Sequence, residues 1–332
     1  MKELLKKIIS GEPLPPEEIR VGFETILRED TRDSEIALFL TSLSTRGLDA
    51  DVLTEAARVL REKMTPVLLQ APDAIDTCGT GGDRSGSFNF STAAGLLAAA
   101  CGVPVAKHGN RAITSKSGSA DLLEALNIPI DLGPEAVAEA IEKKHFGFML
   151  APRYHAATQR VQKIRKQLDV TTVFNFLGPL LNPAKVRRQV VGVFAPGMRP
   201  ILGEALRRLG TEMAWIVSSE EGMDELSPSG PTYVTEVTPE GLVEKTVNPA
   251  DAGLRASDPK FLLGKDAAHN AKLLRGIFGK TFFGPIRDGI VLNAAAALVV
   301  SGKAQDLKAG AVMAKGAIES GEAEEILEKL QK

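Results

Sequence analysis

The chain has 332 residues, and with 44% hydrophobic content it can bury one large core or two smaller ones. A formal net charge of −2 excludes a protein built to coat nucleic acid, because such proteins carry a basic excess. The two cysteines, Cys78 and Cys101, have no CxxC spacing, which argues against a disulfide scaffold or a zinc site. The apolar runs 90–106 and 289–302 are too broken or too short to cross a bilayer. We therefore expect a cytoplasmic protein that binds neither membranes nor nucleic acid.

The first 65 residues predict four short helices and no strand. Apolar residues recur at helical spacing from Leu4 to Ile9, and Gly11 ends this first pattern. Pro16 begins the second helix, and the patterns over 33–45 and 51–63 give the third and fourth. This arrangement predicts a small helical unit, and an apolar face left over on it would favour self-association.

From Ala74 onward, short apolar runs alternate with helical patterns. We expect parallel strands near 74–77, 103–106, 147–151, 189–194 and 213–218, with an edge hairpin over 232–237 and 242–247. Helices are expected near 91–101, 119–127, 134–144, 154–168, 199–209, 265–278, 285–301, 304–319 and 321–330. This alternation is typical of an α/β fold with a mostly parallel sheet flanked by helices.

The apolar stretch 171–184 is punctuated by Gly178, Pro179 and Pro183, which indicates a buried connector crossing back to the helical unit. We therefore expect a helical domain of residues 1–70 with part of 165–185. The α/β domain would then comprise residues 71–164 and 186–332.

A glycine-rich turn, DTCGTGGD over 76–83, follows the first predicted strand and precedes a helix that opens with Ser91 and Thr92. Glycines let the backbone approach a ligand closely, and a helix N-terminus adds oriented N–H donors, so the turn suits a pyrophosphate with a metal. The pattern is neither a dinucleotide fingerprint nor a P-loop. A plain turn with a helix cap also explains it.

The segment 84–120 contains no Asp or Glu, whereas the chain average of 42 in 332 residues predicts about four or five. It carries the loop KHGNR over 107–111 after the second predicted strand, where open sheets bind ligands. Lysine, arginine and amide groups there suit phosphate oxygens, and the serines up to Ser119 introduce a second helix N-terminus. A solvated basic loop is the alternative.

Asp224 and Glu225 form an acidic pair on a loop after the fifth predicted strand, and such a pair can hold magnesium or lie on an ordinary surface. Among the four histidines, no pair has metal-ligand spacing, and no nucleophile elbow is present. His155 is expected to open the helix that carries Arg165.

The chain resembles the anthranilate phosphoribosyltransferases of tryptophan biosynthesis over essentially its whole length. The resemblance rests on DTCGTGGD (76–83), FNFSTAA (88–94), AKHGNRAITSKSGSADLLEAL (106–126), IRKQLDVTTVFNFLGPLLNPA (164–184) and GMDELS (222–227). It implies transfer of the phosphoribosyl group of 5-phosphoribosyl 1-diphosphate to the amine of anthranilate. It also implies a helical domain on a larger α/β domain, a cleft between them for the substrates, two Mg²⁺ ions and a homodimer formed through the helical domain.

Carried over by residue, the resemblance implies a donor site, an acceptor site and a metal site. The diphosphate end of the donor would contact Gly79, Gly82, Asp83, Ser87, Asn89, Phe90, Ser91 and Thr92. Its phosphates and ribose would be covered by Lys107, His108, Gly109, Asn110, Arg111, Ala112, Ile113, Thr114, Ser115 and Ser119. Anthranilate would contact Gly79, Asn110 and Arg165, with His108, His155 and Pro179 lining its approach. Ser91 would ligate one magnesium ion, and Asp224 with Glu225 the other.

Lys107 and Arg165 would act as electrostatic and positioning groups, and no residue is assigned as a general base. The chain departs from the family pattern at Arg84, where glycine is frequent, and at Ala156, where proline is frequent; at Ser87 the pattern also allows threonine. Two alternatives remain: a pyrimidine nucleoside phosphorylase of the same architecture, and a non-catalytic relative that binds nucleic acid.

Overall fold

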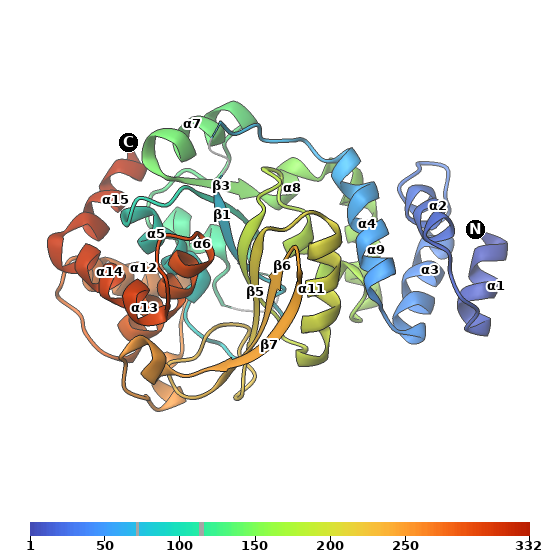
Figure 1. Cartoon of the computed structure of the whole chain (residues 1–332). Coiled ribbons are helices and arrows are strands. Elements are labelled where there is room, and N and C mark those ends of the chain that lie inside the picture. The colour runs from blue at the N-terminus through green and yellow to red at the C-terminus, as the bar shows by residue number, and fades with distance from the viewer. Residues whose placement is uncertain (71–72, 113–115) are drawn as a thin grey trace.

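The computed structural model describes residues 1–70, 73–112 and 116–332. A small helical unit lies at one end of the molecule, and a larger body built on a twisted sheet forms the rest (Figure 1). The two termini lie far apart, the N-terminus on the helical unit and the C-terminus on the opposite end. Where the structure is described, no helix is both long and apolar enough to cross a membrane.

The helical unit begins with four helices at the predicted positions: α1 (Lys2–Ser10), α2 (Pro16–Ile26), α3 (Asp33–Arg46) and α4 (Ala50–Lys63). Gly11 ends α1 in the left-handed conformation with φ 74°. Pro16 begins α2, where its missing N–H costs no hydrogen bond. The Asp49 carboxylate caps α4 by accepting from the Val52 N–H at 2.9 Å.

The sheet has seven strands in the order β3-β2-β1-β4-β5-β6-β7. The first five, which are parallel, are β1 (Ile75–Gly79), β2 (Val105–Gly109), β3 (Phe146–Leu150), β4 (Arg188–Gly192) and β5 (Met213–Ser219). The antiparallel edge consists of β6 (Thr232–Thr238) and β7 (Gly241–Val247). This confirms the expected fold class, and it brings the carboxyl ends of five strands to one edge of the sheet.

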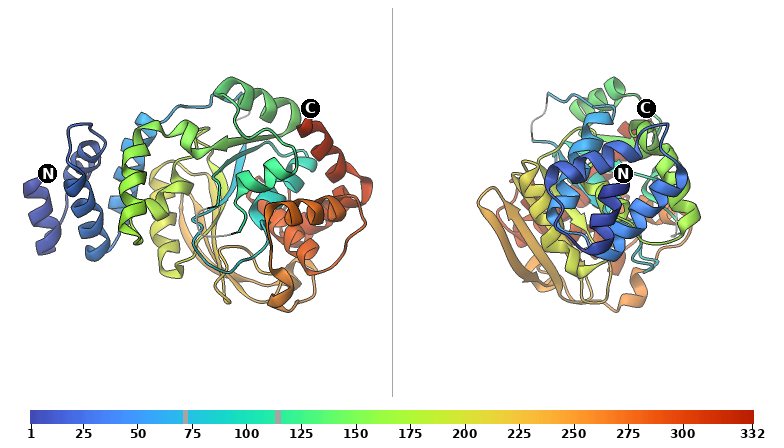
Figure 2. Two further views of the ribbon diagram at one scale, coloured as in Figure 1. Left: turned by 180° about the vertical axis from the view of Figure 1, so that it is seen from behind. Right: turned by 90° about the vertical axis from the view of Figure 1, so that its right-hand side faces the viewer.

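Helices cover both faces of the sheet (Figures 1 and 2). On one face lie α5 (Phe90–Ala100), α6 (Ser119–Ala125), α12 (Ala267–Phe278), α13 (Pro285–Val300), α14 (Leu307–Ser320) and α15 (Glu322–Gln331). On the other face lie α7 (Pro134–Lys144), α11 (Arg199–Arg208) and the helical unit. Successive side chains of β5 point to opposite faces of the sheet. Trp215 and Val217 therefore pack in the core on one face, and Ala214 and Ile216 pack in the core on the other.

The expected helix over 154–168 is wrong in its first part. The chain forms α8 (Ala151–Tyr154), a 3₁₀ turn at Ala156–Thr158 and only then α9 (Gln159–Leu168). The Thr158 hydroxyl donates to the His155 carbonyl at 2.9 Å, a local bond that competes with the helical pattern. His155 therefore does not open the helix of Arg165 but lies in a non-helical link with φ −120° and ψ 50°.

The connector 171–184 is mostly buried, and it contains α10 (Phe174–Leu177) and a 3₁₀ turn at Gly178–Leu180. Phe174 enters the helical core, with its ring centroid 6.4 Å from that of Phe23, which in turn packs edge-on against Phe39 at 5.3 Å. The Val67 N–H donates to the Pro183 carbonyl at 3.0 Å. The connector thus joins the helical unit and the sheet in one continuous core.

Candidate active site

The glycine-rich turn leaves the carboxyl end of β1 with a backbone that requires glycine. Gly81 and Gly82 have φ of 61° and 87°, in the left-handed region where side chains are strained. Arg84 also adopts a positive φ, 56°, a conformation that glycine would adopt without strain. A Cβ atom on Gly79 would lie 2.7 Å from Oδ2 of Asp224. The turn therefore folds directly onto the acidic loop.

Asp224 and Glu225, on the loop between β5 and β6, point inward against this turn. The Asp224 Oδ2 accepts from the Gly81 N–H at 3.1 Å, and the Glu225 Oε1 accepts from the Ser91 N–H at 3.2 Å. Asp224 is only 8% exposed, so the interpretation of the pair as ordinary surface is wrong. Tertiary folding has placed both carboxylates against the glycine turn and the start of α5.

Asn293 on α13 holds this acidic loop in place. Its Oδ1 accepts from the Leu226 N–H at 3.0 Å, and its Nδ2 donates to the Leu226 carbonyl at 2.8 Å. Both contacts are buried, and they fix the backbone immediately after Glu225. No sequence motif indicated Asn293, since a single asparagine in an apolar helix does not reveal which distant loop it will contact.

The Asp224 and Glu225 carboxylates lie close to each other and to the Asp83 carboxylate. Burial raises the pKa of Asp224 to about 7, with a further contribution from the neighbouring Asp83 carboxylate. Burial and the Asp224 charge also raise the pKa of Glu225 well above its usual value. A cation bound between these groups would offset this repulsion and stabilise the ionised form of both carboxyls.

The Asp224 and Glu225 carboxylates fit magnesium, but only if a bound substrate supplies further oxygen atoms. Among the described residues, no cluster of three or more His, Cys, Asp or Glu side chains has the arrangement to hold a metal ion alone. Magnesium is usually bound by one or two carboxylates with substrate phosphates and water completing its shell. Asp224 and Glu225 could supply such carboxylate oxygens. Phosphate oxygens at the adjacent glycine turn would complete the coordination.

Lys107 does not lie on a solvated loop, as the alternative interpretation of the basic segment required. It is 1% exposed on β2, and its ammonium donates to the Thr77 carbonyl beneath the glycine turn. Burial lowers the pKa of Lys107, opposed by the nearby Asp76 and Glu225 charges. The lysine thus supplies positive charge directly under the turn and beside the acidic loop.

The start of α5 presents backbone rather than side chains. Phe90 and Thr92 are completely buried, so their side chains face the core, and the Phe90 N–H donates to the Phe88 carbonyl at 2.7 Å. Asn89 is held by two bonds: its Nδ2 donates to the Ser117 carbonyl at 2.9 Å, and its Oδ1 accepts from Asn270 Nδ2 at 2.9 Å. Asn270, on α12, was not indicated by the sequence.

A pocket of about 240 Å³ lies between the segment that follows the glycine turn and residues 263–265 of the C-terminal half. The Gly264 N–H donates to the Gly86 carbonyl at 2.9 Å, and Ser87 forms a bridge with Leu263. The pocket is lined by Ser85, Gly86, Ser87, Lys116, Ser117, Leu263, Gly264 and Lys265. Two lysines and three serines make it suited to phosphate oxygens.

The loop after β2 is tied down by Asp121 on α6. The Asp121 Oδ2 accepts from the Ala112 N–H at 2.8 Å and from the Gly118 N–H at 2.9 Å. Arg111 pairs with Asp121 and Glu124, so its guanidinium is directed to α6. The Gly118 N–H before α6 is therefore already occupied by a carboxylate, and the placement of Ser119 at a second anion site stays a prediction.

Gly109 and Asn110 lead into this loop. A Cβ atom on Gly109 would lie 2.8 Å from the Phe148 ring, and the Asn110 carbonyl accepts from the Ala120 N–H at 3.2 Å. The predicted donor contacts Ile113, Thr114 and Ser115 lie outside the described residues.

Arg165 on α9 is held by three neutral oxygen acceptors. Its guanidinium donates to Thr172 Oγ1 at 3.1 Å, to Gln162 Oε1 at 2.8 Å and to Asn175 Oδ1 at 3.1 Å. Burial lowers its pKa to about 10, so the guanidinium stays charged near neutral pH. Three of its five N–H donors are engaged and no carboxylate pairs with it within the described part of the chain, which leaves it suited to bind an anionic ligand.

His108 and His155 face each other across β2 and the α8–α9 link. Their Nε2 atoms are 3.1 Å apart, and their ring centroids 5.0 Å apart. The carbonyl of Pro179 accepts from Gln189 Nε2 at 3.3 Å, which fixes the connector beside these rings. The fold thus brings together two histidines that are 47 residues apart.

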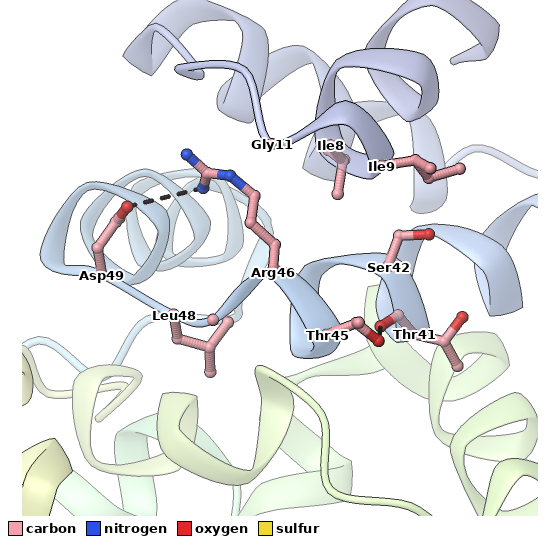
Figure 3. Close-up of a pocket in the computed structure, with 10 residues that line it drawn as sticks. Ile8, Ile9, Gly11, Thr41, Ser42, Thr45, Arg46, Leu48 and Asp49 are labelled. Carbon is pink, nitrogen blue, oxygen red and sulfur yellow. Dashed lines mark hydrogen bonds and ion pairs between the residues drawn. The ribbon is translucent and has the colours of Figure 1, made fainter.

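A larger pocket, of about 680 Å³, lies on the helical unit between α1 and the end of α3 (Figure 3). It is lined by Ile8, Ile9, Gly11, Thr41, Ser42, Thr45, Arg46, Gly47, Leu48 and Asp49. None of these residues belongs to the predicted sites. The chemistry-bearing groups instead gather at the carboxyl edge of the sheet.

The helical unit and the α/β body each match a domain of one protein family. The family model described as the helical bundle domain of a glycosyl transferase family matches residues 2–64, and the a/b domain model of the same family matches residues 71–324. The chain is 45% identical over 331 residues to the anthranilate phosphoribosyltransferase of Azospirillum brasilense, covering 99% of this chain and 92% of that protein.

Solved structures of the same family superpose closely on this chain. The anthranilate phosphoribosyltransferase of Thermus thermophilus superposes with a TM-score of 0.92 at 40% identity, covering 99% of this chain and 98% of that one. The Saccharomyces cerevisiae enzyme in complex with PRPP and Mg superposes with a TM-score of 0.90 at 30% identity, covering 99% and 96%. The chain belongs to the anthranilate phosphoribosyltransferase family.

Proposed function

We propose that this protein transfers the phosphoribosyl group of 5-phosphoribosyl 1-diphosphate to the amine of anthranilate, giving N-(5-phosphoribosyl)anthranilate and diphosphate in tryptophan biosynthesis. The observation that carries the proposal is the contact of Asp224 with the glycine turn through the Gly81 N–H. A buried carboxylate against a glycine-rich turn suits a magnesium ion that also binds the diphosphate oxygens of a ligand. The yeast relative bound to PRPP and Mg supports this donor.

The donor site would work by charge and position. The glycine turn and the start of α5 would direct N–H groups at the diphosphate, and Lys107 would add a buried positive charge beneath it. Bound Mg²⁺ supplies charge that offsets the departing diphosphate. We assign Asp224 and Glu225 to one ion and Ser91 to a second. Asn89 would keep the start of α5 in register through its bonds to Ser117 and Asn270.

The acceptor site would lie on the α9 side of the cleft. Arg165 would pair with the carboxylate of anthranilate in the two-pronged geometry that a guanidinium favours, and so align the weakly nucleophilic aromatic amine. Asn110, Gly79, His108, His155 and Pro179 would line its approach. C1 of the ribose becomes oxocarbenium-like as the diphosphate leaves, and the amine attacks from the opposite face.

Two alternatives are less well supported. A pyrimidine nucleoside phosphorylase would need inorganic phosphate and a nucleoside, and the relatives compared above are named as anthranilate phosphoribosyltransferases instead. A nucleic-acid-binding relative is disfavoured by the net charge of −2.

The decisive assay follows the loss of anthranilate fluorescence in the presence of phosphoribosyl diphosphate and Mg²⁺. We expect turnover that stops when EDTA is added. Well-folded protein without turnover would contradict the proposal. Asp224→Asn combined with Glu225→Gln should remove the magnesium dependence of donor binding, whereas Glu220→Gln, an exposed change in the same β5–β6 connection, should not.

We further infer a cytoplasmic homodimer that associates through the helical unit. Ile9, Val21 and Leu38 are 67%, 53% and 45% exposed on it, and such apolar side chains favour burial against a second copy. Light scattering during size-exclusion chromatography would test this. A monomer at micromolar concentration would contradict it.

A further inference from the structure

The backbone pairing of β1 with β2 stops short of the carboxyl edge of the sheet. Both strands lie wholly in the described part of the chain, and the only residues that pair between them are Ile75 and Val105, whereas β1 pairs with β4 over all five residues. One further step of a parallel ladder would join the Thr77 N–H to the Ala106 carbonyl and the His108 N–H to the Thr77 carbonyl. The backbone groups that this step would use are bonded to side chains instead.

Asn182 and Asp76 bridge the two strands where the backbone pairing has stopped. Asn182 Nδ2 donates to the Ala106 carbonyl and to Asp76 Oδ2, both at 2.8 Å. Asn182 Oδ1 accepts from the Ala184 N–H at 2.9 Å, and Asp76 Oδ1 accepts from the backbone N–H of His108 at 3.3 Å. Both side chains are buried, and each of their polar atoms has a partner.

Lys107 completes a side-chain bridge, the name that we give to Asp76, Lys107 and Asn182. Its ammonium donates to the Thr77 carbonyl, another backbone group that a continued ladder would use. Lys107 and Asp76 are both buried, so the bridge removes a positive and a negative charge from water, which costs free energy. Two ladder hydrogen bonds would satisfy the same backbone groups without burying any charge. Stability alone therefore does not account for the bridge.

The side-chain bridge lies beneath the segments that we propose bind the donor. β1 leads into the glycine turn at Gly79, and β2 leads into the loop after Gly109. The Thr77 hydroxyl also donates to the Ser91 carbonyl at 2.9 Å, which ties the same part of β1 to the start of α5. Because side chains take the place of backbone pairing here, they set the separation of the two strand ends. The space between the turn and the loop follows from it.

The same bridge fixes the acceptor side of the site. Asn182 belongs to the connector, and Thr172 and Asn175 of this connector hold the Arg165 guanidinium at 3.1 Å each. A displacement of Asn182 would therefore move the connector relative to both strands. One buried amide thus links the segment that holds Arg165 to the two strands that carry the donor-binding segments.

We propose that Asp76 and Asn182 are positioning residues for the transfer reaction, which hold the glycine turn, the loop after β2 and the connector at a fixed spacing. This inference rests on the proposed function and deepens it. The two residues act through Lys107 and Arg165, and neither would touch a substrate. Such spacing matters when two bound substrates react with each other, because a misplacement of about 1 Å can cost about 10²-fold in rate.

Asn182→Asp tests the side-chain bridge with almost no change of shape. It sets a carboxylate against Asp76 Oδ2 and the Ala106 carbonyl, and it removes the donor that both accept from. We expect the dissociation constant for phosphoribosyl diphosphate with Mg²⁺, measured by calorimetry, to rise by about tenfold or more. The KM for anthranilate should also rise by about tenfold or more, because the same residue fixes the connector.

Asp76→Asn should change both constants in the same direction. The new amide still accepts from the His108 N–H, but it turns a donor toward the Asn182 amide. If Asn182→Asp does not fold, this variant carries the test. The exchanged pair, Asp76→Asn with Asn182→Asp, again sets an amide against a carboxylate, with the hydrogen bond reversed. We expect it to bind the donor about fivefold more tightly than Asn182→Asp alone, although the Ala106 carbonyl still lacks its donor.

The matched control is Val237→Ala, which removes buried methyl groups from β6 opposite Ala214, near the start of β5 and away from the carboxyl edge. It should lower the free energy of unfolding in urea and leave both substrate constants unchanged. Equal changes in this control would overturn the proposal, because they would reduce the bridge to a matter of stability.

Three other results would overturn it. The first is a folded Asn182→Asp or Asp76→Asn protein with both constants within about threefold of the wild type. The second is a rise in only one of the two constants, and the third is an exchanged pair that binds the donor no better than Asn182→Asp. Wild-type protein without turnover would instead overturn the proposed function. Donor binding is measured without turnover, so the two failures are distinguishable.

Discussion

A Cβ atom on Gly192 would overlap the backbone oxygen of Asp224. Gly192 ends β4, and Asp224 lies on the loop after β5, so the two come together only because the strands are neighbours in the sheet. The acidic loop passes directly over the end of β4 to reach the glycine turn. A side chain at Gly192 would block this path. The position of the carboxylates that we propose as magnesium ligands therefore depends on a glycine outside every motif that indicated the site.

Gly192→Ala should destabilise the fold and weaken magnesium use together. Overpacking of this kind costs about 1–3 kcal/mol of the free energy of unfolding, and displacement of Asp224 should raise the Mg²⁺ concentration needed for half-maximal turnover. Urea unfolding and a magnesium titration measure the two effects. Gly197→Ala is the control, since nothing lies within 4 Å of its added Cβ atom. Equal behaviour of the two variants would contradict the prediction.

Asn270→Asp should weaken binding of phosphoribosyl diphosphate. The aspartate can still accept from the Lys265 N–H, but it cannot donate to Asn89, and it adds negative charge beside the phosphate pocket. Loss of the donor to the half-buried Asn89 oxygen costs about 1–3 kcal/mol, or about five- to 150-fold in the dissociation constant, which calorimetry with Mg²⁺ measures. Asn127→Asp, on an exposed turn, should have no effect. Unchanged donor affinity in Asn270→Asp would show that α12 does not support the site.

Arg165→Lys should raise the KM for anthranilate by about tenfold or more and leave donor binding unchanged. A lysine keeps the charge but loses the planar fork that Thr172, Gln162 and Asn175 hold in place. Steady-state kinetics with each substrate varied would measure this. Lys166→Ala, an exposed neighbour on α9, should behave as the wild type. A parallel rise in both KM values would remove Arg165 from the acceptor site.

The buried histidines should make stability depend on pH. Their folded pKa values, about 3 and about 4, lie below the unfolded value of about 6.5, so the unfolded chain binds more protons between these limits. The contribution of each ring is therefore complete above pH 6.5 and is lost as the pH falls, by up to ~1.4 kcal/mol per pH unit.

Urea unfolding of the substrate-free protein at pH 7 and pH 5 would measure this. The carboxyls of Asp224 and Glu225 act with the opposite sign, because their pKa values are raised, so the informative quantity is the difference between variants. His155→Asn should lose less stability than the wild type on acidification, and His145→Asn should match the wild type. The same loss in all three proteins would contradict the assigned protonation.

The sequence by itself determined the elements and half of the site. Gly11 ends a helix and Pro16 begins one through their own backbone conformations, and the alternation of side chains along β5 involves only consecutive residues. The four helices and the strands could therefore be predicted from neighbouring residues alone. The glycine turn was recognisable for the same reason, because positive φ at Gly81 and Gly82 is a local demand.

Only the tertiary structure decided which distant residues complete the site. At the break before α9 the Thr158 hydroxyl donates to the His155 carbonyl, a contact that no periodicity reveals, and His155 there meets His108. Asn270 and Asn293 become important through contacts with segments 181 and 67 residues away. Helices and strands can be predicted because their propensities depend on residues that are neighbours in the chain. A site at the carboxyl edge of a parallel sheet is built from loops that are distant in the chain, and only the strand order brings them together.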